Sequence, residues 1–321
     1  MSRPHKPTPA PLPTKDGVGP SCVALPAGTW ATIDDFLAER FAAVPDSVWR
    51  DRMQRGELLD ERGAAVATGQ PYRSGGKLYY YRSIDDEPRL PFKEQILFQD
   101  EWLVAVDKPH FLPVTPGGRH LQETLLVRLK RRLGIDTLTP LHRLDRETAG
   151  VVVFAVQPHT RGAYQALFAH RQVVKHYEAI APCRPDLSFP LIRRSRLVED
   201  AHFLRMREEP GEPNAETHFE LLETLGRLAR YRLTPVTGRT HQLRVHCAAL
   251  GVPIVGDRMY PELLPADTDD LDRPLQLLAR TLCFTDPISA QPRRFDSLRQ
   301  LAALTDNDRL KPSEVAAAAR R

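Results

Sequence analysis

The sequence predicts an α+β fold in which one mixed, largely antiparallel sheet forms the larger of two domains. Two long segments of alternating polarity, 216–224 and 229–235, follow each other closely, which predicts neighbouring strands with no helix between them. Elsewhere helix and strand signals alternate irregularly, which argues against a doubly wound parallel sheet. A chain of 321 residues is long enough for this domain and a small N-terminal α/β accessory unit.

The two ends of the chain are expected to be loose tails. Residues 1–28 are rich in proline and small polar residues, and such a stretch buries too little apolar surface to offset the entropy of ordering. We therefore expect a flexible Pro-rich tail that serves as a plain spacer. Residues 303–321 are rich in alanine and end in two arginines, which predicts a loose C-terminal tail.

Residues 29–86 predict a small N-terminal accessory domain. Thr32 and Asp35 form a capping-box pattern before apolar residues at helical spacing, and a second short helix covers about 47–53. Short strands punctuated by glycines are expected between residues 57 and 82. Arginines on the second helix leave two alternatives open, a small RNA-binding module or an extension that only packs.

Residues 87–302 are expected to form the larger domain, which begins with a proline-containing linker over 87–91 and carries the motifs discussed below. Strands are expected from buried or alternating apolar patterns, and helices from a 3.6-residue period. The expected strands cover 103–106, 150–156, 173–181, 216–224 and 229–235, and the expected helices cover 124–133 and 160–169. The helix over 124–133 is basic, and a solvated surface is its simplest interpretation.

The composition is that of an ordinary soluble globular protein, with 41% hydrophobic and 27% charged residues. The four cysteines lack the spacing of a zinc site or a disulfide framework, and the N-terminus lacks an apolar signal segment. No apolar run reaches the roughly 20 residues of a membrane span. These features predict a cytoplasmic protein without a membrane partner. The formal net charge of +4 is compatible with a polyanionic partner but does not establish one.

An acidic residue in a cationic loop is the first feature that indicates chemistry. Asp145 lies in the sequence HRLDRETAG (142–150), directly before an apolar strand. Its neighbours His142, Arg143 and Arg146 are cations or potential cations that would keep a carboxylate nucleophile ionised. A structural ion pair at a turn is the alternative, and the loop taken alone favours that alternative.

A second segment, PVTGRTHQLRVH over 235–246, runs from a strand end through a glycine turn into a helix. Thr240 is expected to cap this helix, whose exposed amides suit a phosphate or carboxylate. Arg244 follows Thr240 by one helical turn, so we expect both side chains to face one site. An ordinary basic helix face would explain one or two of these features but not their concentration in so short a segment.

Together the two segments closely resemble the RluA-type family of pseudouridine synthases. The family motifs H-R-L-D-x-x-T-x-G and G-R-T-H-Q-L-R-V-H are matched at 142–150 and 238–246. Further matches are L-G-x-P-I-x-G-D at 250–257, D-K-P at 107–109 and K-x-Y-x-A at 175–179. The resemblance covers roughly residues 90–290 in the family's order, which makes it far more specific than one short motif.

The resemblance implies a pseudouridine synthase fold with a central RNA-binding cleft, and an isomerase that converts specific uridines in structured RNA to pseudouridine. It implies that Asp145 is the nucleophile, acting at the anomeric carbon of a flipped-out uridine. Arg244 matches the arginine that pairs with this aspartate, and Tyr177 the tyrosine that stacks on the base and assists a late proton removal. Arg143 matches an arginine that, in some relatives, fills the space that the flipped-out uridine leaves in the RNA stack. Glu147 is expected to brace the loop or an arginine, because a second catalytic carboxylate would promote hydrolysis.

We expect RNA as the partner, with ribosomal RNA favoured over transfer RNA, and a monomer that uses no metal, nucleotide or other cofactor. Arg239, His241 and the basic helix over 124–133 are candidates for contacts to the RNA backbone. The alternative is a non-catalytic RNA-binding protein with the same fold, but such a protein has no physical need to retain the aspartate, tyrosine and arginine together. An aspartyl-nucleophile hydrolase is disfavoured because its usual second aspartate is missing.

Overall fold

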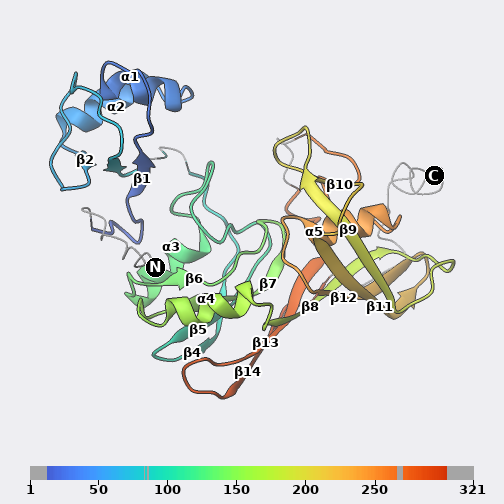
Figure 1. Ribbon diagram of the computed structural model, residues 1–321. Coiled ribbons are helices and arrows are strands. Elements are labelled where there is room, and N and C mark those ends of the chain that lie inside the picture. Colours follow the sequence, from blue (N-terminus) through green and yellow to red (C-terminus); the bar gives the residue numbers. More distant parts are fainter. Residues whose placement is uncertain (1–12, 83, 85–86, 266–269, 302–321) are drawn as a thin grey trace. The chain divides into compact units, whose positions relative to one another are not determined.

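The computed structural model describes residues 13–301 except 83, 85–86 and 266–269 (Figure 1). The expected C-terminal tail, and the expected N-terminal tail up to residue 12, lie outside the described residues. The chain divides into two compact units. The first contains residues up to 88 with 116–123 and 127–136, and the second contains 89–115, 124–126 and the residues from 137 onward. Within the described residues, no helix is long and apolar enough to cross a membrane.

The first unit is built on a three-stranded antiparallel sheet with the strand order β1-β3-β2. Its elements are β1 (Ser21–Ala24), α1 (Ile33–Arg40), α2 (Asp46–Gln54), β2 (Leu58–Asp60) and β3 (Lys77–Tyr80). The predicted capping box is confirmed, because the Thr32 hydroxyl accepts from the Asp35 N–H and the Asp35 carboxylate accepts from the Thr32 N–H. Apolar side chains of both helices and the sheet form one core, which includes Phe36, Trp49 and Leu78.

Residues 21–24 differ from the prediction, which places them in the N-terminal tail. They form strand β1 and pair with β3, with Ser21 opposite Tyr80 and Val23 opposite Leu78. The Val23 side chain is 9% exposed and belongs to the core of the first unit. A ladder of backbone hydrogen bonds and one buried valine therefore order a segment that composition alone assigns to a tail.

The second unit contains a large sheet with the strand order β10-β9-β11-β12-β8-β13-β7-β5-β4, with β14 beside β13 and β6 beside β7. Its strands are β4 (Gln95–Gln99), β5 (Leu103–Lys108), β6 (Thr139–Pro140), β7 (Ala149–Ala155), β8 (Val174–Pro182), β9 (Leu191–Glu199), β10 (Met206–Glu209), β11 (Ala215–Leu225), β12 (Leu228–Pro235), β13 (Leu277–Thr285) and β14 (Pro292–Asp296). These pairs are antiparallel except β13 with β7. The predicted mixed, largely antiparallel sheet is confirmed.

The expected helices are also present, but residues 127–136, and with them most of the helix expected over 124–133, belong to the first unit and not to the larger domain. These helices are α3 (Leu125–Leu133), α4 (Arg161–Ala169) and α5 (Gln242–Ala249). From α4, Tyr164 and Leu167 pack with apolar residues of β5, β7 and β13. From α5, Leu243 and Cys247 pack with apolar residues of β8, β11 and β12. The two halves of the sheet thus have separate clusters of core residues, each covered by one helix.

Strand β13 comes late in the chain but lies between β8 and β7, where it joins the two halves of the sheet (Figure 1). Its residues Leu278 and Ala279 pair with Ala149 and Gly150 of β7. Gly150 has a φ of +115°, and a Cβ atom there would collide with the carbonyl oxygen of Ala279. Only glycine allows this backbone approach, which explains the glycine that ends the first motif.

Strands β4, β6, β9, β10, β13 and β14 were not predicted, and β9 shows one physical reason. Its sequence LIRRSRLVE is interrupted by arginines and does not alternate cleanly between apolar and polar residues. In the sheet, Arg194 lies opposite Glu216 of β11, and the two side chains form an ion pair at 2.8 Å. Arg193 likewise pairs with Glu208 of β10. Charge pairs between strands replace the apolar alternation on which the prediction depends.

Candidate active site

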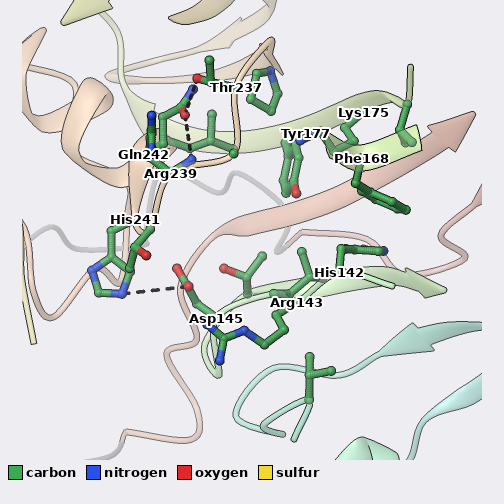
Figure 2. A pocket seen from close by; sticks show the side chains of 18 of the residues that line it. His142, Arg143, Asp145, Phe168, Lys175, Tyr177, Thr237, Arg239, His241 and Gln242 are labelled. Carbon is green, nitrogen blue, oxygen red and sulfur yellow. Dashed lines mark hydrogen bonds and ion pairs between the residues drawn. The ribbon is translucent and has the colours of Figure 1, made fainter. Parts of the chain in front are cut away.

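Three segments of the second unit converge on one cavity of about 710 Å³ (Figure 2). They are the loop before β7, the strand β8, and the turn between β12 and α5. The side chains of Arg143, Asp145, Tyr177 and Arg244 all line this cavity. The structure therefore brings together the predicted nucleophile and the three predicted substrate-binding residues, whereas none of the described lining residues belongs to the basic helix over 124–133.

The two carboxylate oxygens of Asp145 face different side chains. Oδ2 lies 3.6 Å from Nη1 of Arg244, and Oδ1 lies 3.9 Å from Nε2 of His241. The Asp145 side chain is 30% exposed, so part of the carboxylate is open to the cavity. Both distances are longer than a hydrogen bond, which leaves the oxygens available to a substrate.

Arg244 is held by a second aspartate, Asp257, which the sequence analysis did not single out. Nε and Nη2 of Arg244 donate to the Asp257 carboxylate at 2.8 and 2.6 Å, and both side chains are 1% exposed. Burial opposes the charge of Arg244, but the Asp257 carboxylate outweighs it and raises the pKa of the arginine. The remaining Nη1 is buried without a hydrogen-bond partner among the described residues, and it faces Asp145 at 3.6 Å and Glu147 at 3.7 Å.

The turn into α5 shows that the predicted Thr240 cap is wrong. The helix begins at Gln242, and its N-cap residue is His241, whose φ of +52° lies in the left-handed region. The side-chain oxygen of Gln242 shapes this turn, because it accepts from Oγ1 of Thr237 at 2.7 Å and from the N–H of Arg239 at 3.1 Å (Figure 2). Thr240 lines the cavity but does not cap the helix.

Tyr177 and Lys175 are two residues apart on β8, and both side chains line the cavity. Burial, with a smaller effect of the Asp145 charge, raises the pKa of Tyr177, so its hydroxyl is protonated at neutral pH. Burial also lowers the pKa of Lys175. Figure 2 shows both side chains extending from β8 into the space that the Asp145 loop borders. The cavity thus offers an aromatic ring and an amine opposite a carboxylate.

Comparisons with known proteins place this site in a family. The profile described as RNA pseudouridylate synthase matches residues 102–249. The chain is 34% identical to the dual-specificity RNA pseudouridine synthase RluA of Haemophilus ducreyi over 65% of this chain and 95% of that protein. It is 31% identical to an RNA pseudouridine synthase of Synechocystis over 70% of this chain and 78% of that protein. The chain belongs to the RluA-type family of RNA pseudouridine synthases.

Two solved structures agree with this assignment. Human RNA Pseudouridylate Synthase Domain Containing 4 is 30% identical with a TM-score of 0.50, over 64% of this chain and 88% of that one. Human RNA Pseudouridylate Synthase Domain Containing 1 is 26% identical with a TM-score of 0.54, over 67% of this chain and 86% of that one. The predicted pseudouridine synthase fold is confirmed, and the protein is an isomerase that acts on RNA.

In this synthase, Lys108 and Glu147 stabilise the loop that carries Asp145. The Lys108 ammonium is 0% exposed and donates to three backbone carbonyls at 2.8–3.1 Å, those of Pro109, Leu112 and Arg146. Burial lowers the pKa of Lys108 to about 7, although the carboxylates of Glu147 and Asp145 oppose this effect. Glu147 lies 3.7 Å from Arg244, which is the bracing contact expected from the sequence.

His142 does not add positive charge to the loop, in contrast to the expectation. Its Nε2 accepts from the N–H of Val153 at 3.2 Å, and its ring stacks on Phe168 with 5.1 Å between ring centroids. Burial lowers the pKa of His142 to about 3, so its imidazole is neutral at physiological pH. The arginines of the loop alone supply its positive charge.

Sequence reasoning missed Asp257, Tyr260 and the approach of His241 to Asp145. Asp257 is the last residue of the matched phrase L-G-x-P-I-x-G-D, so a usable signal was present. His241 was expected to contact an RNA backbone, but its side chain is only 11% exposed and faces Asp145. Tyr260 carried no signal, because it lies outside every matched motif.

The lining of the cavity is strongly cationic. Its described residues include six cations, Arg143, Arg146, Arg171, Lys175, Arg239 and Arg244. Asp145 is the one carboxylate among the described lining residues. Such a surface suits a nucleic-acid strand, because the cations can neutralise its phosphates while one nucleotide lies beside the single carboxylate. Among the residues that the structure describes, no group of three or more His, Cys, Asp or Glu side chains is placed to hold a metal ion.

Proposed function

We propose that this synthase converts specific uridines of structured RNA to pseudouridine with Asp145 as its nucleophile, and that it favours ribosomal over transfer RNA. The observation that carries the proposal is the isolation of Asp145 as the one carboxylate among the described lining residues, beside a buried arginine. The cationic walls support an RNA strand as the ligand.

The proposed reaction balances within one nucleotide. An oxygen of Asp145 bonds to the anomeric carbon C1′, the C1′–N1 bond breaks, and its electron pair leaves with the uracil. The uracil turns, its C5 bonds to C1′, and Asp145 departs with the electrons of the ester bond. Loss of the proton from C5 and protonation of N1 complete the product. This sequence consumes no oxidant, reductant or second substrate, so we propose that no cofactor takes part.

Arg244 has the geometry to keep the nucleophile ionised and aimed. Asp257 binds two of its nitrogens, so the guanidinium cannot turn away from Asp145 without breaking both hydrogen bonds. The free Nη1 then supplies a fixed positive charge 3.6 Å from Oδ2. Pre-set charges of this kind stabilise a developing ionic state without reorganisation during the reaction.

We propose that Tyr177 stacks on the target base. We propose that Arg143 fills the position in the RNA stack that the flipped-out uridine leaves. The Tyr177 ring lines the cavity, which supports a stacking role. Burial raises the pKa of its hydroxyl, so the hydroxyl is protonated at neutral pH and would have to pass on its own proton to assist the late proton removal that the resemblance also implies. Arg143 is exposed and lines the cavity, as a side chain that enters the RNA must be. Unstacking a uridine costs a few kcal/mol, which Arg143 and phosphate contacts would offset.

The relatives carry different RNA specificities in their names. The Haemophilus ducreyi relative is called dual-specificity. A yeast mitochondrial relative, 27% identical over 71% of this chain and 50% of that protein, is called a tRNA pseudouridine(32) synthase. Both RNA classes therefore enter the test, with ribosomal RNA as the proposed one.

The decisive test combines pseudouridine mapping with one isosteric variant. Pseudouridine is mapped in ribosomal and transfer RNA from cells with and without the gene, and the purified protein is then assayed on the RNA that lacks the modification. We expect Asp145→Asn to bind this RNA as the unaltered protein does and to form no product. Asp186→Asn, an exposed aspartate outside the cavity, is the matched control and should remain active.

Each part of the proposal can fail separately. Conversion by Asp145→Asn at the unaltered rate would contradict the nucleophile. Sites found in transfer RNA only would contradict the ribosomal preference. Binding by the unaltered protein without conversion of any RNA would favour the non-catalytic alternative.

A further inference from the structure

We propose that His241 is a positioning residue for the nucleophile, held by Tyr260 so that its Nε2–H faces Oδ1 of Asp145 while Arg244 faces Oδ2. The inference rests on the proposed role of Asp145 and adds a second support to the one that Arg244 supplies. Figure 2 shows the imidazole turned toward the Asp145 carboxylate.

The backbone of His241 is the first observation that points beyond an ordinary turn. Its φ of +52° lies in the left-handed region, which residues with a Cβ adopt rarely and at a cost in energy. The side chain is only 11% exposed although it lines the cavity. A strained backbone that turns a buried ring toward the nucleophile is a common feature of functional sites.

Tyr260 determines which nitrogen of His241 carries the hydrogen. The Tyr260 hydroxyl accepts from the N–H of Met206 at 2.7 Å and lies 3.0 Å from Nδ1 of His241. Among the described contacts of this hydroxyl, Nδ1 is the one that can accept the hydroxyl's own hydrogen, so we assign Tyr260 as the donor to Nδ1. Nδ1 then bears no hydrogen, and the hydrogen of the neutral ring is on Nε2, the atom 3.9 Å from Oδ1 of Asp145.

The surroundings of Tyr260 keep this donor in place. Its side chain is 4% exposed, and burial raises the pKa of its hydroxyl, so the hydroxyl retains its hydrogen at neutral pH. The rings of His241 and Tyr260 meet edge to face, with 5.7 Å between their centroids. The Arg244 guanidinium lies over the Tyr260 ring at 5.5 Å, which ties the two supports of Asp145 together.

One short segment after α5 holds both supports. Asp257 binds Arg244 through both oxygens, and its Oδ1 also accepts from the N–H of Tyr260 at 3.1 Å. The segment therefore orients Arg244 through a carboxylate and His241 through a phenol. Each oxygen of Asp145 consequently faces one donor, and a residue of the segment after α5 orients each donor. This arrangement restricts rotation of the Asp145 carboxylate.

The charge of His241 follows from the groups around it. Asp145 and Glu147 approach from the loop before β7, Arg244 from α5, and Asp257 and Tyr260 from the segment after α5. Burial is the largest effect and lowers the pKa of His241, with Asp145 opposing it. The ring is therefore neutral at neutral pH, and it orients Asp145 without forming an ion pair that would weaken the nucleophile. Protonation in acid would create that ion pair, so the rate should fall there.

Two isosteric substitutions separate positioning from packing. In His241→Asn the amide occupies the place of Nδ1 only, and asparagine tolerates the left-handed backbone, so the turn is retained and the donor to Asp145 is lost. In His241→Gln the amide nitrogen reaches the place of Nε2 and retains a donor. We expect the single-turnover rate at saturating RNA to fall on the order of 10- to 100-fold in His241→Asn, with RNA affinity unchanged, and to be partly restored in His241→Gln.

Tyr260→Phe and the pH profile provide the second measurement. Without the phenol the ring can adopt either tautomer, so we expect a smaller fall in rate than in His241→Asn. The unaltered protein should lose rate in acid, and His241→Asn should lack that limb of the profile. His218→Asn, at a half-buried histidine of β11 outside the cavity, is the matched control and should behave as the unaltered protein.

The inference is overturned if His241→Asn retains the full rate, if its affinity falls while its rate stays, or if its acid limb persists. A His241→Asn protein that does not fold shifts the test to Tyr260→Phe, where an unchanged rate would overturn the inference. Asp145→Asn is measured in parallel. If Asp145→Asn is active, the proposed nucleophile fails, and if only the histidine variants are active, the positioning role alone fails.

Discussion

Arg244 lies between two aspartates that differ in exposure, in distance to the guanidinium and in hydrogen bonding. Asp257 is 1% exposed and accepts from Arg244 at 2.8 and 2.6 Å and from the N–H groups of Met259 and Tyr260. Asp145 is 30% exposed and meets the same guanidinium at 3.6 Å. The comparison teaches that a carboxylate with satisfied hydrogen bonds anchors the arginine, while the carboxylate without them remains available to react.

The largest effects are expected when each aspartate is changed to asparagine in turn, which tests whether Asp257 anchors Arg244 and Asp145 reacts. Asp257→Asn leaves a buried arginine without its main partner, so we expect the free energy of unfolding to fall by about 3 kcal/mol and activity to be lost. Asp145→Asn should abolish activity and change stability by about 0.5 kcal/mol or less. Urea denaturation followed by circular dichroism measures both, and equal stability losses would show that the two carboxylates are not specialised.

Arg244→Lys tests whether the planar guanidinium, with several N–H groups, is required for contact with both aspartates at once. A lysine retains the charge but offers one point of attachment, so it can face Asp257 or Asp145 and not both in a fixed geometry. We expect a fall on the order of 100-fold in the single-turnover rate. Arg194→Lys, at an exposed ion pair on β9, is the control and should change nothing. An Arg244→Lys enzyme with the full rate would mean that charge alone suffices.

Acid should lower the stability of the folded protein through His246, which lies in α5 two residues after Arg244. This residue is 0% exposed, its ring nitrogens lie 2.9 and 3.0 Å from the hydroxyls of Thr217 and Ser195, and burial lowers its pKa to about 4. The unfolded chain takes up a proton near pH 6.5 and the folded protein does not, so stability falls as the pH drops from about 6.5 toward 4.

The expected loss through His246 is roughly 2 kcal/mol at pH 5. Urea denaturation at pH 7.5 and pH 5 measures it, and His246→Gln should remove this part of the pH dependence. If the unaltered protein and His246→Gln lose stability in parallel, His246 is not the titrating group.

The smallest expected effect is on RNA affinity, when Lys175 in the wall of the cavity is replaced. We expect Lys175→Met to lower RNA affinity modestly and to reduce the slope of log K against log salt by about 1, because one phosphate contact is lost. Lys93→Met removes the same charge from an exposed position outside the cavity and should leave the slope unchanged. An unchanged slope in Lys175→Met would place Lys175 away from the RNA.

The features that could be predicted from the sequence are those whose chemistry is local. Asp145 and Arg244 stand in two motifs that indicate a site when they are taken together, and β7 is a run of apolar residues that must be buried. The geometry of the support could not be predicted in this way. The turn at His241, with its left-handed backbone, is shaped by hydrogen bonds that the Gln242 side-chain oxygen accepts from Thr237 and Arg239. The partner of Arg244 is determined only when the segment around Asp257 packs against α5.

The parallel pairing of β13 with β7 could not be predicted either, because it joins segments far apart in the chain. Periodicity indicates that a segment is a strand but not which strand lies beside it. The charged strand β9 shows a different reason, since its ion pairs to β10 and β11 exist only once the sheet has formed.

The central place of β13 has a consequence for synthesis of the protein. A ribosome makes Asp145, Tyr177 and Arg244 long before it makes Leu277–Thr285, yet that strand lies between β8 and β7 in the finished sheet. Until β13 emerges, the two halves of the sheet have no strand to join them, although each already carries part of the cavity. A nascent chain can therefore hold the complete set of site residues and still be inactive. Catalysis should therefore require that β13 has been made and has paired with both β8 and β7.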